Sequence, residues 1–371
     1  MTQTRLALAA LALVAMISPI TLGGQQADKS KPAEPEAISF DAAHSDLPKV
    51  VIVTTGGTIA ERRDPKTGGL VPSLSGKQLV AAVPGLDKIA NVGVLDFSDI
   101  DSSHMTPQMW ADLSRSVDRV LMLNDVVGAV VTHGTDTMAE GAFFLDLTLT
   151  SDKPVVFTGA MNGASDPAPD GPGNIYDAVL QVTSDEAKDW GVTVTLNRYV
   201  NAARHVRKTN TTNVQTFESG DFGYLGYIHG ERVRRYNDRP DRVRLPVPDR
   251  LPKVAYIAAY AGDDGAFVRH AVEQGAEGIV VQAVGAGNVN AEMGDAIKHA
   301  LDNNVAVVIA TRVAHGAVEP IYADKGGGAR LLKEGCILAG TLDGPKARLL
   351  LMLGLAEHGN DRAELKKLFG E

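Results

Sequence analysis

The sequence predicts an α/β protein with two domains: a larger N-terminal domain built on a mostly parallel, doubly wound sheet, and a smaller C-terminal α/β domain. Three observations favour this fold. Short apolar runs rich in Val and Ile alternate with helical patterns, as expected for buried parallel strands and their crossover helices. Residues 238–252 contain four prolines and many charges, which is typical of an interdomain linker. The chain of 371 residues is long enough for two hydrophobic cores.

The N-terminus has the features of a secretory signal peptide, which we place at residues 1–24. Arg5 supplies the positive charge, and the apolar run Leu6–Ile17 is too short to span a bilayer comfortably. An N-terminal membrane anchor is the alternative. Residues 25–47 are polar and rich in Pro and Ala, which predicts a disordered tether. We therefore expect export to the periplasm, with no membrane attachment after processing.

The N-terminal catalytic domain is expected to span residues 48–237 and to begin with the strand Val50–Val53. Thr58–Glu61 matches the S/T-x-x-E capping pattern, but no apolar helical run follows, so we predict no helix there. Residues 61–73 are charged and Gly-rich, which favours a mobile surface loop or lid. A second capping box, starting at Thr137, does precede a helical pattern. The remaining elements are strands at 92–98, 126–132, 154–158 and 192–196, and helices at 107–121, 137–149 and 174–184.

The C-terminal domain is expected to span residues 253–371, after the linker at 238–252. The alternation of strands and helices resumes there, with strands at 253–259, 278–282 and 305–310, and helices at 264–274, 291–302, 344–357 and 360–370.

Composition excludes several classes of function. The formal net charge of −9 argues against a nucleic-acid partner. Cys336 is the single cysteine, so no intrachain disulfide is possible, and no Cys/His spacing resembles a zinc site. The sequence contains neither of the glycine-rich phosphate-binding patterns and no G-x-S-x-G elbow. We expect no metal or organic cofactor.

Small polar residues follow three predicted strands at their carboxyl ends, where open α/β sheets bind ligands. The first group is Gly57 and Thr58, the second is Thr132–Thr137, and the third is Asp101–Met105. The alternatives are a plain turn for the first group, a helix-start carboxylate for Asp136 and a polar loop for the third group. We expect His133 to be a structural hydrogen-bonding residue.

Lys208 lies in a segment rich in Thr and Asn that follows a predicted strand. A solvated lysine is the ordinary interpretation. If Lys208 is buried beside Asp136, it can act in proton transfer. A threonine hydroxyl is a weak nucleophile until a base or a positioned charge activates it, and Asp136 and Lys208 are candidates for that role.

The sequences TGGTIA (residues 55–60) and THGTDT (residues 132–137) occur in the order found in the bacterial-type L-asparaginase/glutaminase family, which the chain resembles from about residue 48 to its end. The signal peptide makes it similar to the exported, type II members. The resemblance implies hydrolysis of L-asparagine through a threonine acyl-enzyme, with L-glutamine as a second candidate substrate. A glutaminase-dominant enzyme and a non-catalytic exported amino-acid-binding protein are the alternatives.

The resemblance also assigns roles to individual residues. It implies Thr58 as the nucleophile and a second catalytic group, with substrate-binding residues around both. It further implies a homotetramer built as a dimer of dimers, in which Asn288 reaches into the active site of a neighbouring subunit. The second catalytic group is Thr135, Asp136 and Lys208, and the substrate-binding residues are Gly57, Ser102, Ser103, Gly134 and Asn288.

The chain departs from the family at three places. Ser103 stands where the family usually has glutamine, so selectivity for the substrate side chain is open. The family's lid tyrosine is missing, because no tyrosine occurs between Thr58 and Tyr176. The place of a glutamate donated across the subunit interface falls at Ala323 or Asp324.

Overall fold

The computed structural model describes residues 38–370, so the expected signal peptide (1–24) and residues 25–37 of the expected tether lie outside the described part. A disordered tether as far as residue 47 is wrong, because residues 38–47 are bound to the domain. Ile38 and Phe40 pack against the hydrophobic core, and the side chain of Asn91 donates hydrogen bonds to the carbonyls of Asp41 and His44. Two apolar side chains and an asparagine in the core therefore fix this segment.

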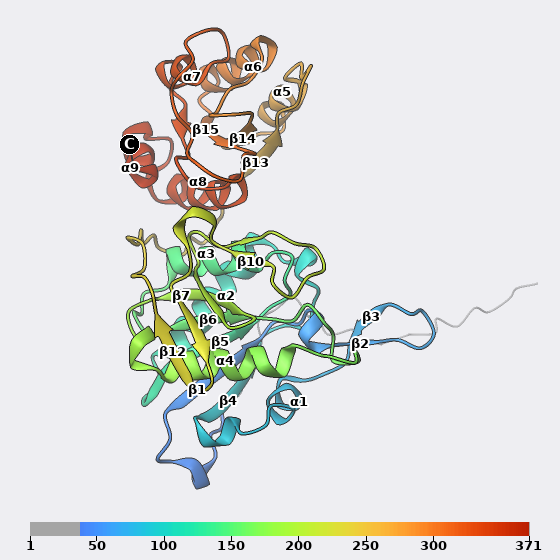
Figure 1. The fold of residues 1–371 in the computed structure, drawn as a ribbon. Helices are drawn as coiled ribbons and strands as arrows, with labels where there is room; N and C mark the ends of the chain where they lie inside the picture. The colour runs from blue at the N-terminus through green and yellow to red at the C-terminus, as the bar shows by residue number, and fades with distance from the viewer. Residues whose placement is uncertain (1–37, 371) are drawn as a thin grey trace, which may run out of the picture. The chain divides into compact units, whose positions relative to one another are not determined.

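The N-terminal half forms an eight-stranded sheet in the order β12-β11-β8-β7-β6-β5-β1-β4 (Figure 1). The strands from β4 to β7 pair in parallel, while β8, β11 and β12 extend the sheet as an antiparallel edge. The predicted mostly parallel sheet is confirmed. The strands are β1 Lys49–Thr54, β4 Asn91–Asp96, β5 Val126–Thr132, β6 Val155–Thr158, β7 Val192–Leu196, β8 Tyr199–Ala202, β11 Gly226–His229 and β12 Arg232–Arg235.

Helices cover both faces of this sheet, as doubly wound architecture requires. Alternate residues of β1 point to opposite faces: Val51 and Val53 belong to the core cluster that contains α2 and α3, whereas Val50 and Ile52 belong to the cluster that contains α1 and α4. The buried run predicted from the sequence is thus buried on both sides. The helices are α1 Gly76–Ala81, α2 Pro107–Leu121, α3 Met138–Thr148 and α4 Gly171–Thr183.

Some elements differ from the sequence-based predictions. The loop expected at 61–73 is an antiparallel hairpin of β2 Glu61–Arg63 and β3 Leu70–Pro72, whose turn is held by hydrogen bonds to the Asp64 side chain. Helix α4 begins at Gly171 and not at Asn174, because Pro172 suits the first turn of a helix. The smaller elements of this half are β9 Arg207–Lys208, β10 Phe217–Glu218 and the 3₁₀ turns η1 Ala42–His44, η2 Thr58–Ala60, η3 Leu86–Lys88, η4 Ser102–His104, η5 Asp185–Ala187 and η6 Gly220–Phe222.

The segment 238–252 contains no helix or strand, yet it is attached to the N-terminal domain. Leu245 is buried, and its N–H donates to the carbonyl of Leu147 at 2.8 Å. The Arg242 guanidinium donates to the carbonyl of Leu149, also at 2.8 Å. The segment predicted as a linker therefore packs along the end of α3.

The C-terminal half forms a four-stranded parallel sheet in the order β13-β14-β15-β16, which confirms the second α/β domain. Helices α5, α6 and α7 share one core cluster with this sheet, while α8 and α9 pack against the other set of strand residues. The elements are β13 Val254–Ala258, α5 Ala266–Glu273, β14 Gly278–Ala283, α6 Ala291–Asp302, β15 Ala306–Thr311, α7 Gly328–Glu334, β16 Ile337–Leu338, α8 Gly344–His358 and α9 Arg362–Phe369.

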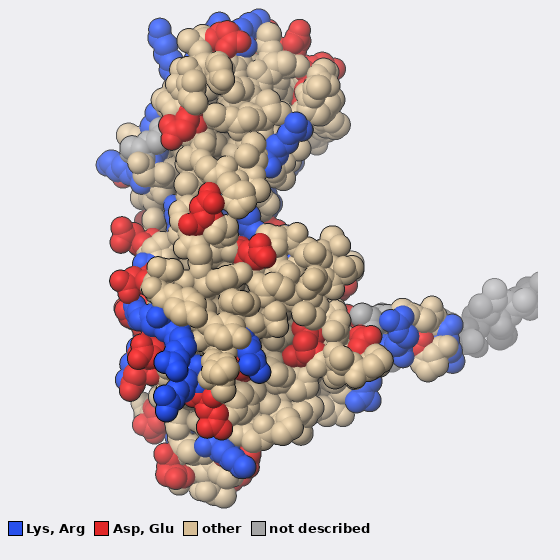
Figure 2. All heavy atoms as spheres, in the orientation of Figure 1, with Lys and Arg blue, Asp and Glu red and all other residues tan. Residues whose placement is uncertain are grey.

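Acidic and basic side chains are interspersed on the face drawn in Figure 2, where a group of basic side chains at the left of the lower half lies beside acidic ones. Arg235 of β12, for example, is paired with Asp189 at 2.6 Å and with Asp238 at 2.7 Å. Within residues 38–370, every helix falls short of the length or the apolarity needed to cross a membrane.

Candidate active site

The candidate site lies at the carboxyl ends of β1 and β5, which are adjacent and parallel, with Thr54 opposite Thr132. From β1 the chain continues to β4, which is the neighbour of β1 on one side. From β5 the chain continues to β6, which lies in the opposite direction along the sheet. The strand order therefore reverses between β1 and β5, and such a switch point is where open α/β sheets bind ligands. Both predicted threonine loops begin at this point.

Glycines let the loops approach one another closely. Gly57 has φ = 83°, a region that favours glycine, and a Cβ atom there would lie 2.4 Å from the Cα of Gly134. A Cβ atom on Gly134 would in turn lie 2.6 Å from the Oγ of Ser102. Three loops thus meet at two positions where only glycine fits.

Thr58 opens the 3₁₀ turn η2 directly after these glycines and is half-buried. Glu61 follows three residues later and is 6% exposed; its N–H donates to the carbonyl of Thr58 across the turn, which places the two side chains beside each other. Burial raises the pKa of Glu61 above its ordinary value of 4.5, and the negative charges of Asp101 and Asp99 raise it further, while the bond from Thr58 opposes this shift. The nucleophile predicted from the sequence is therefore in contact with a buried carboxyl group.

Sequence reasoning missed Glu61 as a functional residue, although the signal was present. The Thr58–Glu61 spacing matches a helix-capping box, but no apolar helical run follows it, so the match predicts no helix. No α-helix forms there, as predicted, but the same spacing brings the two side chains together on a 3₁₀ turn.

Ser102 is buried and holds the second threonine loop in place. Its Oγ accepts a hydrogen bond from the N–H of Asp136 at 3.2 Å, and its carbonyl accepts one from the Thr137 hydroxyl at 2.8 Å. Thr137 does stand at the N-cap position of α3, but its side chain makes no capping bond. The predicted capping box is therefore wrong, because the hydroxyl binds Ser102 instead.

Lys208 is brought to the same loop from 73 residues away. Its Nζ donates to Thr135 Oγ1 at 2.9 Å and to Asp136 Oδ1 at 2.7 Å. Thr135 is buried, the Lys208 side chain is 20% exposed, and the Asp136 side chain is 60% exposed. The ammonium group can thus orient the Thr135 hydroxyl while its charge is balanced by the carboxylate.

The strand pairing that fixes Lys208 is short. Lys208 lies in β9, opposite Phe217 of β10, and the turn between the two strands is closed by the Thr209 N–H, which donates to the carbonyl of Thr216 at 2.7 Å. The Thr- and Asn-rich composition of the segment supplies these turn bonds.

His133 is fully buried and fits a structural role. Its Nδ1 lies 2.7 Å from the carbonyl of Gly134, and its Nε2 lies 3.5 Å from the indole Nε1 of Trp110. A neutral ring with its proton on Nδ1 donates to Gly134 and accepts from Trp110. Burial lowers the pKa of His133 to about 4, which keeps the ring neutral.

Two other predicted site residues occupy different surroundings. Ser103 is exposed, and its backbone N–H donates to Asp101. Asn288 lies in the loop after β14, where its Oδ1 accepts from the N–H of Gly328 at 3.1 Å and so supports the start of α7. The structure thus gathers Thr58, Ser102, Thr135, Asp136 and Lys208 around Gly57 and Gly134, and places Asn288 in the other domain. No group of three or more His, Cys, Asp or Glu residues within 38–370 is arranged to hold a metal ion.

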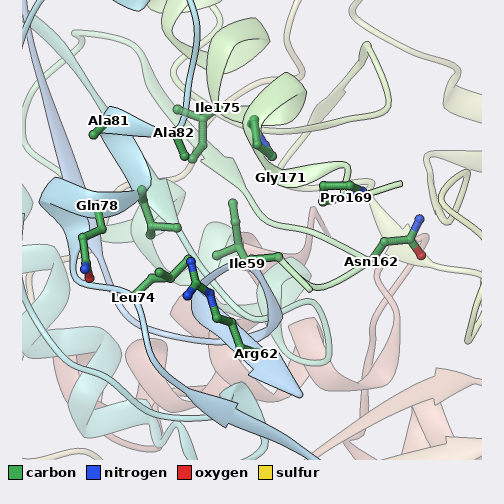
Figure 3. Close-up of a pocket in the computed structure, with 13 residues that line it drawn as sticks. Ile59, Arg62, Leu74, Gln78, Ala81, Ala82, Asn162, Pro169, Gly171 and Ile175 are labelled. Atoms are coloured by element: carbon green, nitrogen blue, oxygen red, sulfur yellow. The ribbon is translucent and has the colours of Figure 1, made fainter. Parts of the chain in front are cut away.

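A cavity of about 470 Å³ lies beside the Thr58 turn, between α1 and α4 (Figure 3). Ile59 and Arg62 face it from the turn and β2, Gln78 from α1, and Ile175 from α4. The described residues that line it include none of the candidate catalytic residues. We therefore assign the reaction to the β1–β5 crevice and not to this cavity.

Comparisons with known proteins match most of the chain. Residues 49–241 match a family model described as "Asparaginase, N-terminal", and residues 253–369 match "Glutaminase/Asparaginase C-terminal domain". The "Probable L-asparaginase periplasmic" of Haemophilus influenzae is 38% identical, covering 84% of this chain and 90% of the relative. "L-asparaginase 2" of Escherichia coli is 36% identical, and the match covers 90% of this chain and 96% of the relative. The crystal structure of a "Probable Cytoplasmic L-asparaginase" from Campylobacter jejuni has a TM-score of 0.79 and 36% identity, covering 87% of this chain and 99% of that one.

Proposed function

The chain belongs to the bacterial-type L-asparaginase family and hydrolyses L-asparagine to L-aspartate and ammonia, and from this premise we propose that it does so through an acyl-enzyme on Thr58. One observation supports the site most strongly. The Thr58 turn and the Thr135–Lys208–Asp136 group meet in one crevice, at the contact of Gly57 with Gly134.

Acylation begins when the Thr58 hydroxyl attacks the side-chain amide carbon of asparagine. The C–O bond forms, the carbonyl electrons move to oxygen, and ammonia leaves when the C–N bond breaks. Backbone N–H groups near Gly57 and Thr135 are the candidates to stabilise the oxyanion, and one such donor typically contributes about 3 kcal/mol. Water then hydrolyses the ester and frees Thr58.

We assign the second group to positioning and to proton transfer with water. Lys208 fixes the Thr135 hydroxyl by a bond of 2.9 Å, and Asp136 holds Lys208 at 2.7 Å. Ser102 binds the backbone of Asp136 and so supports this group, in addition to its assigned contact with the substrate.

Steady-state ammonia release tests the proposed function. We compare L-asparagine, L-glutamine and D-asparagine, with the purified Thr58→Ala protein as the control for a contaminating host enzyme. L-asparagine is expected to have the highest kcat/KM, at least about tenfold above L-glutamine, because one methylene in a fitted site changes binding by about 1–3 kcal/mol. A wild-type protein that binds asparagine without releasing ammonia would support the binding-protein alternative.

We propose that the site is completed by Asn288 from a neighbouring subunit, in a homotetramer built as a dimer of dimers. The oxygen of Asn288 is engaged with Gly328, which leaves its amide N–H groups to hold the substrate's carboxylate. Because a two-fold interface is isologous, each dimer then has two composite sites.

Subunit mixing tests this arrangement. Asn288→Asp keeps the oxygen that accepts from Gly328 but removes the amide donors, so the loop should stay folded while activity is lost. After exchange of inactive Thr58→Ala and Asn288→Asp subunits, about a quarter of the wild-type activity should return, because half the dimers are hybrids with one intact site of two. Hybrids that form and remain inactive would assign Asn288 to an ordinary turn.

We also propose that the protein is exported to the periplasm. The support is the signal-like sequence of residues 1–24 and the similarity to a relative named as periplasmic in Haemophilus influenzae.

The acidic net charge of −9 and the substrate class give no reason for a nucleic-acid partner.

A further inference from the structure

Glu61 occupies a rigid position directly after the Thr58 turn. Its N–H donates to the carbonyl of Thr58, its carbonyl accepts from the N–H of Ala164 at 3.3 Å, and its backbone pairs with Pro72 in the β2–β3 hairpin. The residue is 6% exposed. Backbone contacts on three sides therefore fix the direction of this side chain.

The surroundings of the Glu61 carboxylate are unfavourable for a structural role. The charges that act most strongly on it come from Asp101 and Asp99, both negative, in the segment that follows β4. A buried carboxylate close to other carboxylates destabilises a fold, whereas an alkyl side chain at the same place would not. The interaction that favours its ionised form is the hydrogen bond from the Thr58 hydroxyl.

We propose that Glu61 is the general base that accepts the proton of Thr58 when this hydroxyl attacks the amide. This inference rests on the proposed role of Thr58 as the nucleophile. As the C–O bond forms, the Thr58 proton passes to the Glu61 carboxylate; when the C–N bond breaks, the resulting carboxylic acid gives that proton to the leaving nitrogen, which departs as ammonia. The cycle leaves Glu61 ionised, as it began, and consumes no further reactant.

The two acid-base groups of the site then have separate tasks. Glu61 lies beside Thr58 on the 3₁₀ turn, whereas Lys208 is hydrogen-bonded to Thr135 and Asp136. A base is most effective when its pKa approaches the working pH. The pKa of Glu61 is raised above its ordinary value and is therefore shifted towards neutral pH.

Glu61→Gln tests the proposal, because the amide keeps the size of the side chain and an oxygen for Thr58 but cannot accept the proton. We expect kcat on L-asparagine to fall about 10²–10⁴-fold, with KM changed less than about threefold. The melting temperature should not fall, since a buried charge is removed. The control is Glu186→Gln, the same change at an exposed glutamate of the same domain, which should leave kcat unchanged.

The pH profile separates a base from a structural residue. In the wild type, kcat/KM should rise with pH through the pKa of Glu61, above pH 4.5, because the base acts when it is deprotonated. Asp99→Asn removes one negative charge from an exposed position and should shift this acid limb to lower pH. The acid limb should be absent in the residual activity of Glu61→Gln.

Two results would contradict the role of Glu61 without contradicting the proposed function. One is a Glu61→Gln variant that keeps more than about a tenth of the wild-type kcat, because this loss is too small for a general base. The other is an Asp99→Asn variant whose acid limb lies at the same pH as that of the wild type. Failure of the proposed function has a different signature, since the wild type would then release no ammonia or Thr58→Ala would retain turnover.

Discussion

Replacing Thr58 with alanine is expected to lower kcat on L-asparagine by at least about 10³-fold, which corresponds to about 4 kcal/mol of transition-state stabilisation. The hydroxyl that we propose as the nucleophile is lost, so the remaining groups can act only on a direct attack by water. Folding should persist, because Thr58 is half-buried on a surface turn and Glu61 can take up a proton when its partner is removed. Steady-state kinetics and thermal unfolding measure the two effects separately.

Thr58→Ser is the matched control for this variant. It keeps a hydroxyl beside Glu61 and should retain much more turnover than Thr58→Ala. If Thr58→Ala instead keeps more than about a hundredth of the wild-type kcat, an effect below about 2.7 kcal/mol, another residue carries the acyl group.

The second large effect is expected at the Lys208 group. Lys208→Met and Asp136→Asn should each lower kcat by several powers of ten, because the Thr135 hydroxyl loses the ammonium at 2.9 Å or the carboxylate that holds this ammonium at 2.7 Å. The double variant should be little worse than either single variant, since residues that act as one unit are strongly non-additive. A double-mutant cycle on kcat gives the coupling directly.

Lys188→Met is a suitable control, because Lys188 is an exposed lysine paired with Asp185 outside the site. Its kcat should equal that of the wild type. Losses at Lys208 and Asp136 that add in full would mean that the two residues work independently, in spite of their contact.

The elements that could be predicted from the sequence are those whose pattern of apolar residues indicates a buried strand or a buried helix face. Strand β5 and helices α2 and α6 have the predicted bounds, since continuous Val-rich runs and clear helix starts mark them. The edge strand β12 was not predicted because its sequence, Arg-Val-Arg-Arg, has one buried residue and no apolar run. Strand β8 was not predicted although three of its four residues are buried, because its sequence, Tyr-Val-Asn-Ala, is short and interrupted by a polar residue. The β2–β3 hairpin was missed because its residues are mostly exposed.

The parts of the site that lie on strand ends could also be predicted from the residues, whereas the grouping of Lys208 with Thr135 and Asp136 came from the family resemblance. Gly57, Thr58, Thr135 and Asp136 follow apolar strands that the sequence shows plainly. The bond from Lys208 to Thr135 spans 73 residues and depends on the β9–β10 pair, which has no sequence signal of its own. Glu61 was not recognised because a 3₁₀ turn, unlike an α-helix, leaves no apolar period.

The proposed role of Glu61 also bears on the lid tyrosine that this chain lacks. The family resemblance implies a side chain that helps to activate the nucleophile, and the chain has no tyrosine between Thr58 and Tyr176. Glu61, in contact with Thr58, is the residue that we propose for this task.

Direct identification of the covalent intermediate tests whether Thr58 carries the acyl group. Rapid acid quenching of the wild-type enzyme at saturating L-asparagine, followed by proteolysis and mass spectrometry, locates any covalent adduct. We predict an aspartyl ester on the peptide that contains Thr58, formed during turnover and absent from Thr58→Ala. An aspartyl ester on the peptide that contains Thr135 would contradict the account.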